Sequence, residues 1–304
     1  NYLMARTFLE RLEAGQVMVA DGATGTNHQH NGLRPGVPPE EWVFDEPEKV
    51  LDLHRAFVAA GADIILTNSF GGTRLRMRDS KYANRAPEIN RRAVELAREA
   101  AARRDGVLVA GSMGPTGSLF QPLGPLVREQ AVETYAEQAA ALTEGGVDFL
   151  LLETMFALDE ALAAIEGVKQ GSHLPVVCTF SFDRGVHTMM GVKPTQVVEA
   201  LKPLGLAAMG ANCGQTLDFM ERVIQEIVGA NPGLPIWAKP NAGLPKGGMI
   251  LPEYDVEPED MAGYAVRYVR AGAQIVGGCC GNTPAHVAAI VRAVQAEAAE
   301  RTHG

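Results

Sequence analysis

Three of the four cysteines in this chain of 304 residues have the spacing and chemistry of metal ligands. Cys279 and Cys280 are adjacent, within "GGCCGNTP" (277–284), and Cys213 ends "GANC" (210–213). A disulfide between neighbouring cysteines strains the peptide that joins them. Thiolates are soft ligands that favour zinc over magnesium or calcium. Three protein sulfurs would leave a fourth position on zinc for a substrate, as a catalytic site requires.

A plainer interpretation is that these cysteines fill a core, because free cysteine is commonly buried as a small apolar residue. Adjacent residues of a regular strand point to opposite faces, so both sulfurs reach one metal only where the strand ends or bends. Gly277, Gly278 and Gly281 permit such a bend. Thr283-Pro284 then has the residue types of a helix N-cap and first helical position.

Short apolar runs alternate with helical patterns along the chain. We expect strands at residues 17–22, 63–70, 107–114, 147–154, 175–182, 206–213, 235–243 and 273–280. They show little polar alternation, which is typical of parallel strands covered on both faces. We expect helices at residues 47–62, 88–104, 127–146, 158–170, 194–205, 216–229, 259–273 and 284–300. Eight strand–helix units predict an α/β fold, a single (β/α)8 TIM barrel, with one domain over residues 1–304.

In this fold, the chemistry takes place at the carboxyl ends of the strands. The predicted strand ends bring a defined set of residues to that rim: Asp21-Gly22, Thr67-Asn68-Ser69, Glu153-Thr154, Asn212-Cys213, Asn241 and Cys279-Cys280. Strands six and eight lie two apart in a barrel, so the three sulfurs can converge. Cys178 lies inside the fifth predicted strand, and we interpret it as a core residue.

Two acidic residues on this rim suit the ammonium group of an amino-acid substrate. Asp21 opens the turn "DGATG" (21–25), whose glycines let backbone approach a ligand closely. It could instead serve as a turn-former or cap. Glu153 follows the apolar run 149–152, where an acid is costly unless it is paired. Its partner could be another protein group rather than a substrate.

Composition excludes some classes of protein. The net charge of −9 and the pI of about 5.3 argue against a nucleic-acid footprint. The basic cluster at 74–85 is interpreted as a solvated face. No apolar stretch is long enough for a membrane span, and residues 1–16 have an amphipathic helical pattern rather than that of a signal peptide. Four cysteines are too few for a disulfide framework, so we expect a reducing cytoplasm.

Taken together, these motifs resemble the zinc-dependent homocysteine S-methyltransferases. The matching segments are "DGATGT" (21–26), "ILTNSFGGTR" (65–74), "GPTG" (114–117), "LLETM" (151–155), "GANC" (210–213), "PNAG" (240–243) and "GGCCGNTP" (277–284). The resemblance therefore covers nearly the whole chain. "PNAG" and "GGCCG" look most like the homocysteine module of cobalamin-dependent methionine synthase. Relatives that use betaine or S-methylmethionine are similar but less close.

The resemblance implies a TIM barrel with a Zn2+ ion held by Cys213, Cys279 and Cys280, and homocysteine sulfur in the open position. It implies that Asn241 is an oxygen ligand when substrate is absent. The residues that match the substrate-binding groups of the family fall into two sets. Asp21 and Glu153 would hold the ammonium, and the carboxylate would meet the backbone N–H groups of Gly22 and Ala23 and the rim residues Thr67, Asn68 and Ser69.

The predicted reaction is zinc-dependent methyl transfer to the thiol of homocysteine, which gives methionine. The sequence leaves the donor open among a methyl-corrinoid partner such as a methylcobalamin protein, betaine and S-methylmethionine. The sequence also leaves two alternative functions open. One is a zinc-holding barrel that docks a corrinoid or other methyl-donor partner, and the other is a methyltransferase for another thiol. A metal-free nucleophilic Cys213 or Cys279 would need a histidine base, and no histidine stands at a predicted strand end.

Two groups of side chains near the rim have no assigned chemistry. His28 and His30 lie in "NHQHNG" (27–32), where we expect a solvated loop or a contact with the donor rather than metal binding. A betaine site would need aromatic rings around the quaternary ammonium. Trp42, Phe44 and Tyr82 are too scattered in the sequence to define one, so we expect them to pack in the core or on the surface.

Overall fold

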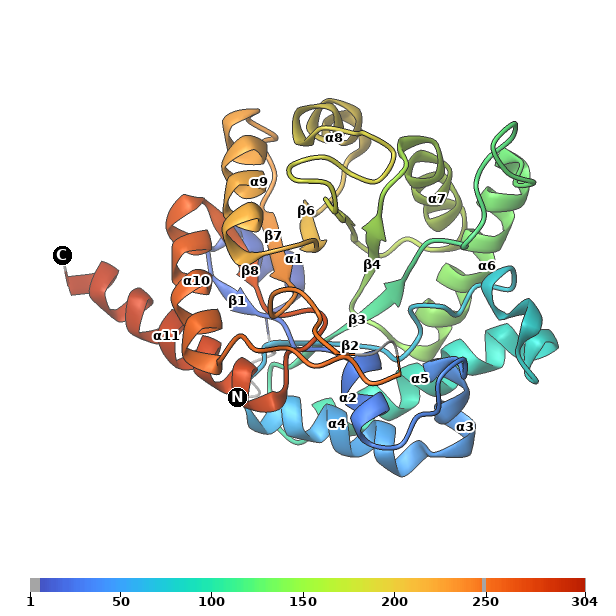
Figure 1. Ribbon diagram of the computed structural model, residues 1–304, viewed down its shortest axis with the longest axis horizontal. Helices are drawn as coiled ribbons and strands as arrows, with labels where there is room; N and C mark the ends of the chain where they lie inside the picture. The colour runs from blue at the N-terminus through green and yellow to red at the C-terminus, as the bar shows by residue number, and fades with distance from the viewer. Residues whose placement is uncertain (1–5, 248–249, 304) are drawn as a thin grey trace.

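Eight parallel strands form a barrel in the computed structural model, which describes residues 6–247 and 250–303 (Figure 1). The order of the strands around the sheet is β1-β8-β7-β6-β5-β4-β3-β2. A bridge between Ala20 and Ile64 joins the two edges and closes the ring. The strands are β1 Met18–Val19, β2 Ile64–Leu66, β3 Leu108–Met113, β4 Phe149–Met155, β5 Val176–Phe180, β6 Ala208–Cys213, β7 Ile236–Pro240 and β8 Ala273–Val276. The predicted TIM barrel is confirmed.

The predicted helices surround this barrel (Figure 1). They are α4 Pro47–Ala59, α5 Ala86–Ala101, α6 Arg128–Gly145, α7 Leu158–Gly171, α8 Pro194–Leu201, α9 Leu217–Gly229, α10 Pro258–Ala271 and α11 Pro284–His303. Short 3-10 turns connect the elements at η1 Pro39–Glu41, η2 Arg76–Asp79, η3 Ala83–Arg85 and η4 Lys202–Leu204. The amphipathic pattern at 1–16 contains α1 Phe8–Glu13, and residues 1–5 lie outside the described part of the chain.

The strands separate two apolar cores, because alternate side chains point to opposite faces of a sheet. One core fills the barrel with residues that include Met18, Ile64, Leu151, Val177 and Ile275. The larger core lies between the sheet and the helices, and it contains Cys178 as predicted. Helix α1 closes the amino end of the barrel, where the ring of Phe8 stacks on that of Phe149 with centroids 3.8 Å apart. The opposite, carboxyl end is left for the polar residues.

The segment between β1 and β2 differs from the prediction. It contains two short helices that the sequence patterns did not indicate, α2 Gly25–His30 and α3 Trp42–Asp45. The expectation of a solvated loop is wrong for His28, which is buried on α2 with its ring centroid 5.0 Å from that of Trp42. Burial lowers the pKa of His28 to about 4, so this imidazole is neutral. His30 is exposed at the end of the same helix.

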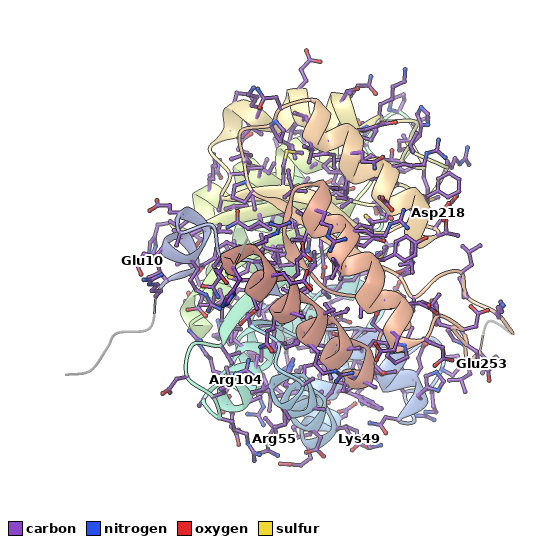
Figure 2. All side chains as sticks on the ribbon, turned by 90° about the vertical axis from the view of Figure 1, so that its left-hand side faces the viewer. Glu10, Lys49, Arg55, Arg104, Asp218 and Glu253 are labelled. Carbon is purple, nitrogen blue, oxygen red and sulfur yellow. The ribbon has the colours of Figure 1, made fainter. Side chains whose placement is uncertain are left out.

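Charged side chains cover the outside of the barrel. Lys49, Arg55 and Glu253 are among those labelled on outer helices and loops in Figure 2. The basic cluster at 74–85 forms ion pairs on the surface, such as Arg74 with Glu137. Trp42 is buried, and Phe44 packs edge-on against Tyr82, so the packing expected of these aromatic residues is confirmed. Within residues 6–247 and 250–303, we find no helix with the length and apolar character of a membrane span.

Candidate metal centre

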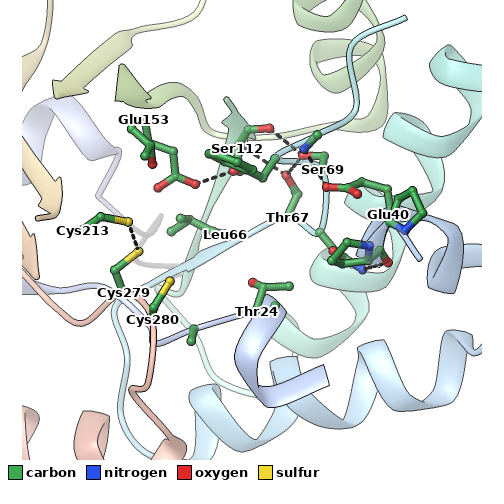
Figure 3. Close-up of a pocket in the computed structure, with 18 of the residues that line it drawn as sticks. Thr24, Glu40, Leu66, Thr67, Ser69, Ser112, Glu153, Cys213, Cys279 and Cys280 are labelled. Atoms are coloured by element: carbon green, nitrogen blue, oxygen red, sulfur yellow. Dashed lines mark hydrogen bonds between the residues drawn. The ribbon is translucent and has the colours of Figure 1, made fainter. Parts of the chain in front are cut away.

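The three predicted cysteine ligands meet at the carboxyl end of the barrel (Figure 3). The sulfurs of Cys213, Cys279 and Cys280 all lie within 4.8 Å of one another, and those of Cys213 and Cys279 are 2.9 Å apart. Two sulfurs on a tetrahedral zinc ion with bonds of about 2.3 Å lie about 3.8 Å apart. The three sulfurs are therefore close enough to share one zinc ion. Those of Cys213 and Cys279 would need to move apart slightly to reach the spacing found on zinc. Among the described residues, no other group of three metal-ligating side chains converges in this way.

The adjacent cysteines reach one point because the chain turns immediately after β8. The N–H of Asn282 donates to the carbonyl oxygen of Cys279, which makes residues 279–282 a β-turn. Gly281, its third residue, has φ of +81°, the left-handed conformation that glycine adopts without strain at this position. The N–H of Cys279 donates to the carbonyl oxygen of Pro240 at the end of β7. The predicted bend therefore exists, and neighbouring backbone holds it in place.

Cys213 reaches the same point through a different break in the strand. On β6, Met209 and Ala211 point outward into the core beneath the helices, so alternation would send Cys213 in that direction as well. Instead, Cys213 has φ of +56°, a left-handed conformation that costs about 1–3 kcal/mol in a residue other than glycine. This turn brings its sulfur back to the mouth of the barrel.

The chemistry of the trio suits a divalent cation. Hydrogen bonds from Cys213 and Cys279 lower the pKa of the Cys280 thiol well below its usual value. Hydrogen bonds with Cys279 and Cys280, together with burial, raise the pKa of Cys213. Like charges this close oppose one another, so the three thiols cannot all ionise without a compensating cation. A metal ion of charge +2 would supply the compensation that lets all three ionise.

Five polar residues form an inner layer directly above the apolar interior of the barrel, and we call them the inner polar layer: Ser112, Glu153, Thr179, Asn212 and Lys239. Each lies an even number of residues after an apolar residue of the barrel interior on the same strand. Their side chains therefore point toward the axis of the barrel. Sequence reasoning predicted a binding role only for Glu153.

Lys239 is the cation of this layer and the partner of Asp21. Its Nζ lies 3.2 Å from Oδ1 of Asp21, and both side chains are almost fully buried. Burial lowers the pKa of Lys239, but attraction from Asp21, Cys279 and Glu153 outweighs burial and holds the pKa above its ordinary value. Burial raises the pKa of Asp21, while Lys239 and the N–H of Leu66 oppose the rise. Asp21 is therefore an ion-pair partner as well as a turn residue.

Glu153 also has a protein partner. Its Oε1 accepts a hydrogen bond of 2.6 Å from the hydroxyl of Ser112 (Figure 3). Burial raises the pKa of Glu153 to about 7, and the charge of Lys239 limits the rise. This carboxyl group is close to the balance between its neutral and ionised forms at neutral pH. A cation that binds beside it would favour the ionised form.

The rim residues after β2 line the same cavity, but most of their polar groups are already engaged. The hydroxyls of Thr67 and Ser69 lie 2.6 Å apart, and Ser69 donates to the carbonyl oxygen of Ser112. Asn68 donates to the carbonyl oxygen of Pro39, away from the sulfurs. The two hydroxyls thus fix the rim between β2 and β3.

Of the two backbone N–H groups expected to meet a substrate carboxylate, those of Gly22 and Ala23, one is free of a partner among the described residues. The N–H of Ala23 donates to the carbonyl oxygen of Asn282 at 3.0 Å, so it is not free for a substrate carboxylate in this structure. No described residue accepts a hydrogen bond from the N–H of Gly22, which lines the cavity. A Cβ at Gly22 would lie 2.6 Å from the carbonyl oxygen of Asn282, which explains why this position is glycine.

Asn241 bridges the two loops that carry the cysteines. Its Oδ1 accepts the N–H of Cys280 at 3.0 Å, and its Nδ2 donates to the carbonyl oxygen of Gly214 at 3.2 Å. An amide oxygen has two lone pairs, so the bond to Cys280 leaves one of them for another partner. This residue fixes the distance between the two halves of the sulfur trio.

One cavity of about 600 Å³, a volume typical of small-molecule sites, is lined by the three cysteines together with Glu153, Lys239 and residues 67–69. Asp21 and Asn241 do not line it. The cysteines and Glu153 lie at one end, and Glu40 lies at the other (Figure 3). His28 and His30 do not line it. The sequence contained one signal for Lys239, which is a charged residue inside the apolar strand 236–240 and therefore needs a counter-charge. Ser112 carried no comparable signal.

Comparisons with known proteins agree with this geometry. A family described as homocysteine S-methyltransferase matches residues 18–294. The methionine synthase of Mycobacterium leprae is 30% identical over 297 residues, which cover 92% of this chain and 24% of that protein. The methionine synthase of Mycobacterium tuberculosis is 30% identical over 295 residues, with coverage of 92% and 25%. The chain therefore spans about a quarter of the length of these curated relatives.

Solved structures of a homocysteine methyltransferase are also similar to this chain. The homocysteine methyltransferase MmuM from Escherichia coli, in its metallated form, is 25% identical with a TM-score of 0.76, and the match covers 92% of this chain and 96% of that one. Its oxidised form is 26% identical with a TM-score of 0.75, over 92% and 97%. The likeness extends over almost the whole of both chains.

The buried ion pair generates a prediction about stability. Lys239→Met should lower the free energy of unfolding by about 3–5 kcal/mol, because it leaves the Asp21 carboxylate buried without a counter-charge. Urea unfolding at neutral pH measures the change. Lys246→Met is the matched control, because Lys246 pairs with Asp255 in an exposed position and should show no resolvable loss. Equal losses in the two variants would contradict the assignment.

Proposed function

The chain belongs to the homocysteine S-methyltransferase family, and on this premise we propose that it transfers a methyl group to the thiol of homocysteine and so forms methionine. Cys213, Cys279 and Cys280 would hold Zn2+ for this reaction. The observation that carries the proposal is the convergence of these three sulfurs in one cavity with the buried carboxyl group of Glu153. The methionine synthase relatives and the MmuM structures support it.

The role of zinc in the proposed reaction would be to ionise the thiol of homocysteine. A free thiol has a pKa of about 8.5, so little of it is ionised at neutral pH, and zinc binds thiol sulfur with loss of its proton. With the proton removed in this way, the protein needs no general base. The absence of any histidine from the described lining of the cavity agrees with that requirement.

The remaining groups would orient the amino-acid end of the substrate. Glu153 and Asp21 are the candidate partners of the ammonium, and Lys239 keeps the combined negative charge of this region tolerable. The N–H of Gly22 is the candidate donor to the substrate carboxylate. The hydroxyls of Thr67 and Ser69 would position the rim around it, and Asn68 would act through its bond to Pro39.

We propose that Asn241 contributes in two ways. It holds the loops of Cys213 and Cys280 together through the bonds described above. The second lone pair of its side-chain oxygen could serve as an oxygen ligand to zinc when homocysteine is absent. Both roles require the amide in its present place.

The methyl donor would enter from the opposite end of the cavity. Glu40 marks that end in Figure 3, and the lining of the cavity also includes Val37, Pro38, Pro39, Phe70 and Arg76. Glu40 is buried and accepts the N–H of Gly71 at 2.6 Å, while Arg76 lies over the ring of Phe70 at 5.8 Å. The cavity therefore continues beyond the groups assigned to homocysteine, which leaves room for a second reactant.

The zinc site is tested by a matched pair of variants. Cys280→Ala should reduce bound zinc from about one ion per chain to near zero, because two remaining thiolates form an incomplete set. Cys178→Ala should leave zinc unchanged, since Cys178 is buried in the core outside the barrel. Metal analysis of the purified proteins measures both. Stoichiometric zinc in Cys280→Ala would refute the ligand set.

The substrate-binding role of Glu153 is tested separately from the metal. Glu153→Gln should weaken homocysteine binding by about 10–100-fold, the value of one hydrogen bond to a charged group. Zinc content should not change, because Glu153 is not a proposed ligand and a neutral amide costs less to bury than a carboxylate. Calorimetric titration with homocysteine gives the affinity. An unchanged affinity would remove Glu153 from the substrate site.

The reaction itself is tested with a panel of donors. Methylcobalamin, betaine, S-methylmethionine and S-adenosylmethionine are each supplied with homocysteine, with and without a chelator. We expect methionine from at least one donor, and its loss when zinc is removed. Methionine formed equally after zinc removal would contradict the role of the metal. Homocysteine binding without methionine from any donor would favour a barrel that docks a separate donor-carrying protein.

A further inference from the structure

Asn212, on β6, is the fully buried amide of the inner polar layer. Its Oδ1 accepts the backbone N–H of Thr154 at 2.8 Å and the hydroxyl of Thr179 at 2.7 Å. Its Nδ2 lies 2.7 Å from the hydroxyl oxygen of Thr154. Three strands, β4, β5 and β6, thus meet at one side chain.

The orientation of this amide follows from its partners. A backbone N–H can only donate, so the atom that faces the N–H of Thr154 must be the oxygen. The nitrogen therefore faces the sulfurs. It lies 3.5 Å from Sγ of Cys213 and 4.0 Å from Sγ of Cys279. One N–H is directed to the hydroxyl of Thr154, and the other is available to the two sulfurs.

The same amide connects the two irregular strand ends of the site. Cys213, the next residue, has φ of +56°, and Thr154 has φ of +61°. Both left-handed residues depart from strand alternation and turn inward at the mouth of the barrel. Thr154 follows Glu153, the candidate partner of the substrate ammonium. Asn212 therefore links the sulfur trio to the part of the site assigned to the substrate.

We propose that Asn212 is a positioning residue of the metal centre, which donates an N–H to the ligating sulfurs and ties them to the Glu153–Thr154 strand end. This inference rests on the proposed zinc site. Three thiolates close together repel one another, and a hydrogen bond from a neutral amide withdraws charge from the sulfurs that accept it. Outer partners of this kind commonly change metal affinity by about 10–100-fold when they are lost.

A matched pair of variants separates this role from a purely structural one. Asn212→Leu keeps the approximate volume of the side chain and removes its N–H groups. Thr179→Val removes one hydrogen bond from the same amide but leaves the N–H that faces the sulfurs in place. Circular dichroism confirms folding, and competition with a chelator at fixed pH gives the zinc affinity. Cobalt in place of zinc reports charge on the sulfurs through the thiolate-to-cobalt absorption band.

We expect zinc affinity to fall by about 10–100-fold in Asn212→Leu. The cobalt band should move to lower energy, because a sulfur without its hydrogen bond gives up an electron more easily. Thr179→Val should match the unmodified protein in both measurements. A folded Asn212→Leu with unchanged affinity and band would overturn the inference. An equal loss in Thr179→Val would also overturn it, because rigidity alone would then explain the effect.

The unmodified protein supplies an independent measurement if Asn212→Leu does not fold. In protein loaded with ¹¹³Cd, an N–H···S hydrogen bond to a ligating sulfur transmits a scalar coupling from the metal to the amide nitrogen and its protons. We expect that coupling at Nδ2 of Asn212. Cadmium that couples to the β-protons of the three cysteines but not to Asn212 would overturn this inference alone. A protein that binds neither cadmium nor zinc would overturn the zinc site as well.

Discussion

Three sulfurs from two strands must meet at one point, and the regular alternation of strand side chains opposes this. Of any two adjacent residues in a strand, only one faces the barrel axis. The chain overcomes this limit twice. Gly281 turns the backbone so that Cys279 and Cys280 share a side, and the left-handed conformation of Cys213 returns its sulfur to the mouth. Only the break at Cys213 strains the backbone, and hydrogen bonds to β7 and to Asn241 hold the adjacent cysteines in place.

The second constraint is charge. Asp21 and Glu153 are buried near a cluster of half-buried thiols, and unpaired anions are unfavourable in such a place. Lys239, the cation of the inner polar layer, offsets part of the negative charge of these groups through its ion pair with Asp21. The surplus of acidic groups has a physical explanation in the proposed function, because a metal ion and a substrate ammonium would complete the balance. A barrel built only for stability would contain apolar residues at these positions.

The fold could be predicted because each apolar run is short and several of the helices that follow end in a glycine stop signal. The sulfur trio could be predicted because barrel topology brings strands six and eight to the same rim. The partners of the site could not be predicted, because the pairs Lys239–Asp21 and Ser112–Glu153 depend on side-chain direction across several strands. The members of the inner polar layer lie an even number of residues after an apolar residue of the barrel interior. That count can be made only when the first and last residues of each strand are known. His28 was mistaken for a loop residue because α2 is short and has no side-chain cap.

The proposed reaction depends on the thiol of homocysteine joining the three protein sulfurs on one metal ion. X-ray absorption at the zinc edge, on purified protein before and after addition of homocysteine, tests this most directly. We expect three sulfurs and one lighter atom around zinc in the free protein, and four sulfurs at about 2.3 Å once homocysteine is bound. A zinc environment that does not change on addition of homocysteine, or that contains fewer than three sulfurs at the start, would contradict it.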